Sequence, residues 1–359
     1  MRILLTGICG YVGSRLALRL AETLPGVALM GLDNLSRRGT ETNVRPLMQR
    51  GVRLVHGDVR LSSDFRALPD ADWVIDCAAD PRVLAGIVSH SGCSAEQLTE
   101  HNLVGTLHVL EYCRQRRAGL VLLSSSRVYS IDALTQLPLR ETATRLKPAS
   151  DLKVFPPGFS VDGIAEDFST TAPVSLYGAT KLASEAMALE YGSAFGLPVW
   201  VNRCGVIGGP GQFGQIDQGV FAYWVYSAIL GRPLSYIGFG GTGKQVRDCV
   251  TAEDLADLVV AQLQAPSRNV PRVLNVGGGN AGAASLLELT RICETNIGRA
   301  ISVAKAEEPR PYDIPYYVTD TRLVQRCWGW RPTQNAEQII GNLCGWAVDH
   351  RDLIRGLYS

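Results

Sequence analysis

Six short apolar runs, each ending in a polar or glycine-rich turn, divide the first part of the chain. They lie at 2–6, 27–33, 52–58, 73–79, 119–125 and 198–204. The runs are apolar throughout rather than alternating, which is typical of strands covered by helices on both faces. Between them, three stretches have helical spacing, namely 11–24, 102–116 and 177–195. The alternation predicts an α/β fold built on a Rossmann-type, doubly wound parallel sheet.

The pattern becomes less regular in the second part of the chain. Glycine-rich turns separate further expected elements, which are helices at 219–230, 253–264, 285–297 and 335–349 and a strand at 234–239. We therefore expect a large sheet domain at 1–204, to which the chain returns at about 245–276. A smaller C-terminal substrate-binding domain is expected at 205–244 and 277–359. The stretch 140–175, rich in Pro, Ser, Asp and Thr, is predicted to be a long loop.

Composition narrows the classes of partner. With 46% hydrophobic and 19% charged residues, the chain of 359 residues buries a large core and is not a disordered segment. The 35 Lys and Arg residues balance 34 Asp and Glu residues, so no global positive field attracts a nucleic acid or an acidic membrane. We expect neither as a partner. Any anionic ligand must be held by local groups.

The cysteines and the N-terminus bear on the compartment. The nine cysteines stand singly, without a C-x-x-C pair or a Cys/His cluster at metal-ligand spacing, so we expect buried thiols and no metal. The N-terminus lacks the long apolar segment and cleavage site of a signal peptide. The longest apolar stretch, 220–230, is far shorter than the roughly 20 residues that span a bilayer. These features predict a cytoplasmic protein.

A glycine turn follows the first strand and opens the first helix. Gly7, Gly10 and Gly13 stand where the backbone must turn tightly, approach a pyrophosphate and pack against the sheet. The helix N-terminus offers amide donors to phosphates. Asp33 closes the second strand 20 residues after Gly13, the distance at which a carboxylate accepts the ribose hydroxyls of NAD. The combination predicts an NAD site.

Two neighbouring features leave alternatives open. Arg37 and Arg38 could instead hold the 2′-phosphate of NADP, or form a solvated turn, but Asp33 would repel that phosphate and so favours NAD. Asp58, after the third strand, is suitably placed for the adenine amine. It could equally cap the next turn.

Tyr177 and Lys181 are four positions apart, which brings both side chains to one face of a helix. A neutral phenol is a poor base at neutral pH, but a neighbouring ammonium and a positive nicotinamide ring favour its phenolate. Such a tyrosinate can take a proton from a substrate hydroxyl while hydride leaves the same carbon for NAD. The serines at 124–126 end the fifth strand, and sheet ends carry ligand sites in such folds.

As a set, the segments TGxxGxxG, Asp33, HGDV, Asn102-x-x-Gly-Thr, SSxxxVY and YxxxK resemble the extended short-chain dehydrogenase/reductase family of nucleotide-sugar epimerases and dehydratases. The resemblance covers essentially the whole chain. It implies that Ser125 is the catalytic hydroxyl, Tyr177 the base, and Lys181 its partner and ribose ligand.

The predicted NAD site comprises the glycine turn, residues at the ends of the following strands, and two residues of the helix at 177–195. They are Gly7, Cys9, Gly10, Tyr11, Val12, Asp33, Asn34, Ser36, Arg37, Asp58, Val59, Ala78, Ala79, Ser124, Tyr177 and Lys181.

Departures from the family pattern narrow the implied reaction. Sugar dehydratases carry an Asp-Glu pair after the catalytic hydroxyl, where this chain has Ser126 and Arg127, and decarboxylases carry Glu at the position of Arg127. Both absences favour a reaction that needs only hydride and proton shuttling, which is epimerisation through a transient ketone. Three other positions depart from the family in ways that concern the identity of the sugar. Ser130 stands where the family usually has Gly, Cys204 where CDP-tyvelose epimerase has His, and Val206 where many 4-epimerases have Asn.

More narrowly, the segments 32–39, 217–224 and 241–248 are similar to the CDP-paratose 2-epimerase (CDP-tyvelose epimerase) branch of the family. This implies inversion at carbon 2 of a CDP-linked deoxyhexose. The alternatives are a UDP-hexose or UDP-uronate 4-epimerase, or a nucleotide-sugar dehydrogenase or reductase that releases its cofactor. A non-catalytic dinucleotide-binding regulator is disfavoured, because such proteins often lose the tyrosine and lysine.

The resemblance also implies how a nucleotide-diphosphate sugar would be held. Arg247 and Arg310 would grip the diphosphate, although each could instead form an ion pair with Asp248 or Asp313. The remaining predicted substrate residues are Ser125, Ser126, Gln218 and Gln245. Family homodimers pair through the helices that correspond to 102–116 and 177–195, so we expect a homodimer.

Overall fold

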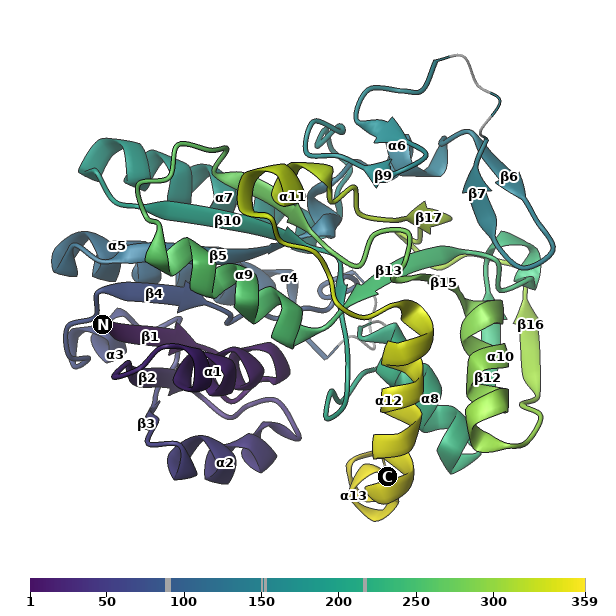
Figure 1. Cartoon of the computed structure of the whole chain (residues 1–359), viewed down its shortest axis with the longest axis horizontal. Coiled ribbons are helices and arrows are strands. Elements are labelled where there is room, and N and C mark those ends of the chain that lie inside the picture. The colour runs from purple at the N-terminus through teal and green to yellow at the C-terminus, as the bar shows by residue number, and fades with distance from the viewer. Residues whose placement is uncertain (88–91, 150, 152–153, 216–217, 359) are drawn as a thin grey trace. The chain divides into compact units, whose positions relative to one another are not determined.

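The computed structural model describes residues 1–87, 92–149, 151, 154–215 and 218–358 (Figure 1). The chain forms two compact units. The first, called the sheet unit, comprises Met1–Val128, Leu176–Arg203 and Ala252–Leu274. The second unit comprises Tyr129–Ser175, Cys204–Thr251 and Asn275–Ser359.

A seven-stranded sheet organises the first unit, in the order β14-β10-β5-β4-β1-β2-β3. The strands are β1 (Arg2–Thr6), β2 (Ala28–Asp33), β3 (Arg53–His56), β4 (Trp73–Asp76), β5 (Gly119–Ser125), β10 (Val199–Cys204) and β14 (Val273–Val276). The pairs β1–β2, β2–β3, β1–β4 and β4–β5 are parallel. The strand order proceeds in opposite directions from β1, so the predicted doubly wound Rossmann-type sheet is confirmed.

Helices flank this sheet, as Figure 1 shows. They are α1 (Tyr11–Thr23), α2 (Val44–Gln49), α3 (Ser62–Arg66), α4 (Ala95–Thr99), α5 (Gly105–Arg116), α7 (Ser175–Phe195) and α9 (Ala252–Gln264). Ile3, Leu4 and Leu5 on β1 are all fully buried, although successive side chains point to opposite faces of a strand. Both faces are therefore covered. Burying each such side chain contributes roughly 1.5–3 kcal/mol, which explains the continuous apolar runs of the sequence.

The second unit contains a small mixed sheet and a helical layer. The sheet strands are β11 (Val206–Ile207), β13 (Val246–Val250), β15 (Ala283–Ser285) and β17 (Tyr316–Tyr317), with β13 between β11 and β15 and also paired with β17. A separate parallel pair joins β12 (Leu234–Ile237) and β16 (Val303–Ala306). The helices are α8 (Val220–Leu230), α10 (Leu286–Ile297), α11 (Arg322–Trp328), α12 (Ala336–Asp349) and α13 (Arg351–Tyr358).

The core of this unit forms between α8, α10 and α12. Helix α8 is apolar around nearly its whole circumference because its residues are buried, including Phe221, Trp224 and Tyr226. Helices α10 and α12 each begin with a capping box, in which the side chain of Ser285 or Asn335 accepts a hydrogen bond from the backbone of the first turn. No helix in the described part of the chain is long and apolar enough to cross a membrane.

The stretch 140–175 contains more structure than the predicted loop. It includes two short hairpins, β6 (Leu139–Glu141) with β7 (Leu146–Pro148) and β8 (Phe159–Ser160) with β9 (Gly163–Ile164), and a short helix, α6 (Ile131–Thr135), precedes them. Residues 129–175 group with the second unit, whereas the sequence pattern placed them within 1–204. Contacts within the second unit agree with this grouping: Arg145 Nε donates to Glu288 Oε1 of α10 at 2.7 Å, and the N–H of Leu146 donates to the carbonyl of Lys244 at 2.9 Å.

Candidate active site

The glycine turn between β1 and α1 leaves no room for a side chain at Gly7 or Gly13. Gly7 has a φ of +61°, and a Cβ there would lie 2.9 Å from the Cα of Ala78. A Cβ on Gly13 would lie 2.4 Å from the carbonyl oxygen of Gly7. Helix α1 begins at Tyr11 with no side-chain cap and no acidic residue in its first turn. Its amide groups can therefore serve a phosphate, as the pattern of glycines predicts.

Asp33 lies against this turn from the end of β2. Its Oδ2 accepts the N–H of Cys9 at 2.8 Å, and its Oδ1 accepts the N–H of Leu35 at 2.8 Å. Each carboxylate oxygen can accept more than one hydrogen bond, so both remain able to accept a ribose hydroxyl. Burial and the charge of Asp33 raise the pKa of Cys9 to about 12, which keeps this thiol neutral.

Asp58, the predicted adenine contact, is already engaged by two side chains. Arg60 donates to it from Nε at 3.0 Å and from Nη2 at 2.7 Å, and Asn34 donates from Nδ2 at 3.0 Å. Burial opposes ionisation, but these hydrogen bonds outweigh it and hold the pKa of Asp58 well below its usual range. Two predicted NAD residues, Asn34 and Asp58, are thus hydrogen-bonded to each other. Arg60, which was not among the predicted site residues, also contacts Asp58.

The loop after β4 carries the predicted residues Ala78 and Ala79 and is fixed by buried polar groups. The Thr6 hydroxyl donates to Asp76 Oδ1 at 2.6 Å and accepts the N–H groups of Cys77 and Ala78, each at 3.2 Å. Sequence analysis missed Thr6 and Asp76 as site-forming residues. The available signal was a threonine at the end of the run 2–6 and an aspartate inside the apolar run 73–79.

Asn102 holds the same loop from the other side. Its Oδ1 accepts the N–H of Asp80 at 2.8 Å, and its Nδ2 donates to the carbonyl of Asp80 at 3.0 Å. It lies in a π-helical turn, Glu100–Val104, between α4 and α5. Such turns are frequent at functional sites because they redirect backbone groups. Here the carbonyl of Asn102 accepts hydrogen bonds from Thr106 at 2.9 Å and from Ser184 at 3.1 Å.

The three predicted catalytic residues all belong to the sheet unit. Ser125 ends β5 and is half-buried, with its Oγ accepting the N–H of Arg127 at 3.1 Å. Tyr177 and Lys181 lie one turn apart on α7 and are buried. Lys181 Nζ donates to the carbonyl of Leu123 at 3.1 Å, two residues before Ser125. The hydrogen bond brings the lysine to the end of the strand that carries the serine.

The predicted substrate arginines occupy the second unit in different settings. Arg247 on β13 forms an ion pair with Asp313 at 3.1 Å and also donates to the carbonyl of Ile314 at 2.7 Å. One of the two alternatives for this arginine, an ion pair, is therefore present, although the partner is Asp313 rather than Asp248. The side chain of Arg247 remains 15% exposed. Arg310 is half-buried on the segment before β17.

The two predicted glutamines also belong to the second unit. Gln245 is buried, and its Nε2 donates to the carbonyl of Ile237 at 3.1 Å. Its Oε1 has no hydrogen-bond partner within the part of the chain that the structure covers. Gln218 is half-buried and bridges to Gln215 through the backbone. The first residue of the segment 217–224 lies outside the described residues.

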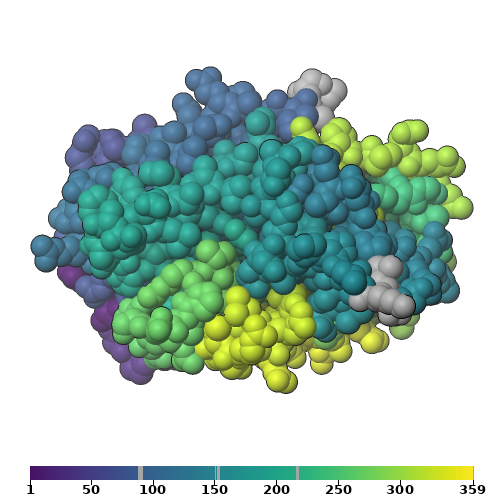
Figure 2. All heavy atoms as spheres, turned by 90° about the horizontal axis from the view of Figure 1, so that it is seen from above, coloured from purple at the N-terminus to yellow at the C-terminus, as the bar shows by residue number. Residues whose placement is uncertain are grey.

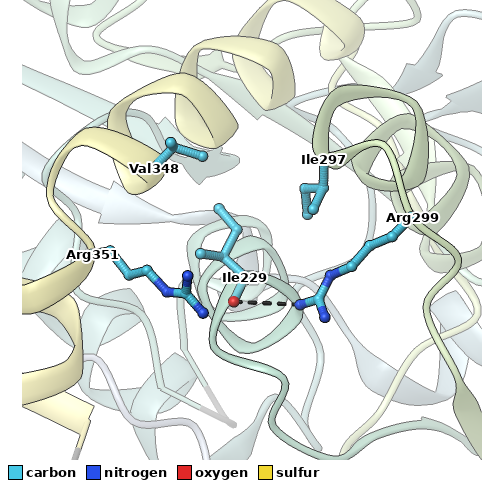
Figure 3. A pocket seen from close by; sticks show the side chains of 5 residues that line it. All are labelled: Ile229, Ile297, Arg299, Val348 and Arg351. Atoms are coloured by element: carbon cyan, nitrogen blue, oxygen red, sulfur yellow. Dashed lines mark hydrogen bonds between the residues drawn. The ribbon is translucent and has the colours of Figure 1, made fainter.

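A hollow of about 300 Å³ in the second unit is lined by Ile229, Ile297, Arg299, Val348 and Arg351 (Figure 3). No predicted site residue lines it. Arg299 donates to the carbonyl of Ala228 at 2.6 Å, so its guanidinium supports the end of α8. Among the described residues, no group of three or more His, Cys, Asp or Glu side chains could hold a metal ion.

Comparison with known proteins places the whole chain among sugar-nucleotide enzymes. Residues 3–277 match the NAD dependent epimerase/dehydratase family. A CDP-paratose 2-epimerase of Salmonella typhi is 30% identical over 357 aligned residues, which cover 96% of this chain and 99% of that protein.

Two crystal structures with the same fold contain NAD. The UDP-glucose 4-epimerase of Thermus thermophilus in complex with NAD is 26% identical, with a TM-score of 0.72 and 99% of both chains covered. A UDP-glucuronic acid 4-epimerase of Bacillus cereus in complex with UDP-glucuronic acid and NAD is 21% identical. Its TM-score is 0.78, and the alignment covers 97% of this chain and 99% of that one.

Proposed function

We propose that this chain, which belongs to the NAD dependent epimerase/dehydratase family, inverts a hydroxyl-bearing carbon of a nucleotide sugar through a transient ketone. Family membership confirms the resemblance inferred from the motifs and the predicted NAD cofactor. The observation that carries the proposed chemistry is the hydrogen bond from Lys181 to Leu123, at 3.1 Å. It joins the helix that carries Tyr177 to the strand that ends in Ser125.

The sheet unit fits NAD. Gly7 and Gly13 exclude side chains from the turn, and α1 begins uncapped, which leaves backbone donors for the pyrophosphate. Asp33 would accept the ribose hydroxyls, and Asn34 with Asp58 would border the adenine. The other cofactor contacts are the remaining predicted residues, namely Cys9, Gly10, Tyr11, Val12, Ser36, Arg37, Val59, Ala78, Ala79, Ser124, Tyr177 and Lys181.

Ser125, Tyr177 and Lys181 would carry the proton steps. Ser125 Oγ would hydrogen-bond the reacting oxygen, and the Tyr177 phenolate would take the hydroxyl proton as the C–H bond breaks. Bound NAD supplies a reversible acceptor for the hydride that leaves the same carbon. Lys181 stabilises the phenolate and holds the ribose. After the sugar ring has turned over, the carbonyl receives the hydride on its opposite face, and Tyr177 returns the proton to its oxygen.

This balance requires no additional base or acid. Ser126 and Arg127 follow Ser125, so no carboxylic acid stands at the two positions where dehydratases carry one. Since both the proton and the hydride return to the sugar, the reaction would need no second substrate to restore the oxidation state of the cofactor. We therefore expect NAD to stay bound through turnover.

For the substrate we propose a CDP-linked deoxyhexose inverted at carbon 2. The support is the similarity to the Salmonella typhi CDP-paratose 2-epimerase along nearly the full length of both chains. Arg247 and Arg310 would hold the diphosphate, with Arg247 oriented by Asp313. Gln218, Gln245 and Ser126 would contact the sugar or base.

We also propose a cytoplasmic homodimer that pairs through α5 and α7. The two helices are linked to each other, since Tyr191 Oη donates to Glu111 Oε1 at 2.7 Å. At the two ends of α7, Leu176 and Phe195 are 41% and 50% exposed. The surface of α7 is teal in the space-filling view of Figure 2. The exposed apolar side chains of Leu176 and Phe195 would supply apolar area to such a helix-pairing interface.

A panel of nucleotide sugars tests the reaction. The purified protein should convert one of them, a CDP-deoxyhexose first, into an isomer without net reduction of NAD. Accumulation of one NADH per sugar would instead identify a dehydrogenase, and a 4-keto-6-deoxy product would identify a dehydratase. Conversion of a UDP-hexose or UDP-uronate in place of the CDP-sugar would leave the proposed chemistry intact and would overturn the proposed substrate. Tyr177→Phe should abolish turnover while NAD remains bound.

A further inference from the structure

A buried charged network lies beside the predicted catalytic residues and is not part of them. Glu185 on α7 and Arg203 on β10 are 3% and 8% exposed. Arg203 Nε lies 3.0 Å from Glu185 Oε2, and its Nη2 lies 2.7 Å from the same oxygen. Ser124 Oγ donates to Glu185 Oε1. Burying an ion pair costs several kcal/mol per ion and often brings no net stability, so stability alone does not explain this network.

Glu185 lies on the same side of α7 as the predicted catalytic residues of that helix. Tyr177, Lys181 and Glu185 are spaced by four residues, so they lie along one side of the helix. The last two contact consecutive residues of β5: Lys181 donates to the carbonyl of Leu123, and Glu185 accepts from Ser124. The residue that follows Ser124 is Ser125. Helix α7 is therefore fastened to β5 at the two positions immediately before the predicted catalytic hydroxyl.

We propose that Glu185 is a positioning residue that sets the register of α7 against β5, so that Tyr177 and Ser125 face the same substrate oxygen. Arg203 acts with it by neutralising the buried carboxylate and fixing its orientation. The inference rests on the proposed function for the roles of Tyr177 and Ser125. Both oxygens of Glu185 are occupied by Ser124 and Arg203, so its contribution passes through those contacts and not through the substrate.

Other contacts keep α7 in place when this network is altered. Ser184 donates to the carbonyl of Asn102 at 3.1 Å, and Asn102 Nδ2 donates to Thr180 at 3.4 Å. These bonds fasten α7 to the π-helical turn before α5, independently of β5. A change at Glu185 should therefore shift the helix locally rather than release it. A displacement of about 1 Å at reacting groups costs on the order of 10²-fold in rate.

The first test compares Glu185→Gln with the wild type. The amide keeps the shape of the side chain and can still accept from Ser124, but it loses the charge that pairs with Arg203. We expect kcat to fall about 10²-fold, with KM and bound NAD close to the wild-type values. Wild-type kcat in this folded variant would overturn the proposal. A rise in KM at unchanged kcat would also overturn it, because it would indicate a role in binding.

A second variant removes the stability question. Replacing both partners, Glu185→Met with Arg203→Met, substitutes apolar chains of similar length and leaves no unpaired buried charge, an exchange that is often neutral or stabilising. We expect this double variant to fold and bind NAD but to lose kcat. If it turns over at the wild-type rate, the network has no positioning role.

The matched control breaks another two-pronged pair of the same unit. Arg19 on α1 donates to Asp257 on α9 through Nε at 2.8 Å and Nη2 at 3.2 Å, and this pair, whose side chains are 39% and 42% exposed, includes no residue of β5 or α7. Arg19→Met should therefore keep wild-type kcat. A loss of kcat equal to that of Glu185→Gln would show that any broken ion pair has this effect and would overturn the proposal.

Crystal structures separate this inference from the proposed function. If the wild type converts no nucleotide sugar, the proposed function fails, and the register is then judged by the distance from Tyr177 Oη to Ser125 Oγ. A changed distance in the double variant, relative to the wild type, supports the positioning role of Glu185. An unchanged distance overturns it.

Discussion

Asp248 on β13 gives a pH-dependent prediction whose size follows from its surroundings. The side chain is fully buried in the second unit. Its Oδ2 accepts the N–H of Gly279 at 3.0 Å, and hydrogen bonds from Thr319 and Gly279 favour the charged form of the carboxylate. Burial disfavours the charged form and raises the pKa of Asp248 from 3.8 to about 6.

The folded protein therefore binds this proton more tightly than the unfolded chain does. The resulting stabilisation is fully present below about pH 4 and is lost as the pH rises through about 6. Each unit of difference corresponds to about 1.4 kcal/mol, so a difference of about two units amounts to about 3 kcal/mol. Asp248→Asn is neutral at every pH and keeps an acceptor for Gly279. Its free energy of unfolding should thus rise relative to that of the wild type by about 3 kcal/mol between about pH 4 and pH 7.

Urea unfolding of both proteins at a series of pH values measures this difference. Taking the difference between the two proteins removes the contributions of other titrating groups, which act in both. The opposite trend, or a difference that stays constant from about pH 4 to pH 7, would refute the reasoning that burial dominates at Asp248. A rise confined to a range above about pH 7 would equally contradict it.

Three further predictions concern the ligands. Gly13→Ala places a Cβ 2.4 Å from the carbonyl of Gly7, so NAD content after purification should fall at least about tenfold, and an unchanged content would contradict the close approach. Asp33→Ala removes the carboxylate proposed for the ribose, and titration with NAD should show weakening by about 2 kcal/mol, whereas equal affinity would exclude this role. Arg247→Ala should raise KM for the nucleotide sugar more than about tenfold while NAD stays bound, and a change in kcat alone would contradict a diphosphate contact.

Much of the sheet unit could be predicted because burial leaves a direct trace in its sequence. The apolar run at 119–125 coincides with β5, and the spacing of apolar residues locates the helix at 177–195 to within two residues of α7. The strands at 139–141 and 146–148 left no such trace, because they lie in a hairpin whose side chains are half-buried or exposed. A polar, turn-rich composition therefore predicted a loop there.

Sequence patterns predicted the candidate site only as far as local spacing determines it. The motif spacing placed Tyr177 and Lys181 on one face of a helix, because residues four positions apart share a face whatever the rest of the fold does. It could not identify Glu185, whose partners Ser124 and Arg203 come from two strands that only the folded sheet brings together. Nor could it choose between Asp248 and Asp313 as the ion-pair partner of Arg247, because Asp313 lies 66 positions away and only the fold brings it close. Contacts between distant segments depend on tertiary packing, which local pattern does not encode.

The central claim is that hydride leaves the sugar and returns to the same carbon. It is tested most directly with a nucleotide sugar deuterated at that carbon. The account predicts an inverted product that retains the deuterium when the reaction is run in ordinary water, with no product from Tyr177→Phe. Loss of the deuterium to solvent would contradict the account, because it would show that the carbon is inverted by proton exchange rather than by transient oxidation.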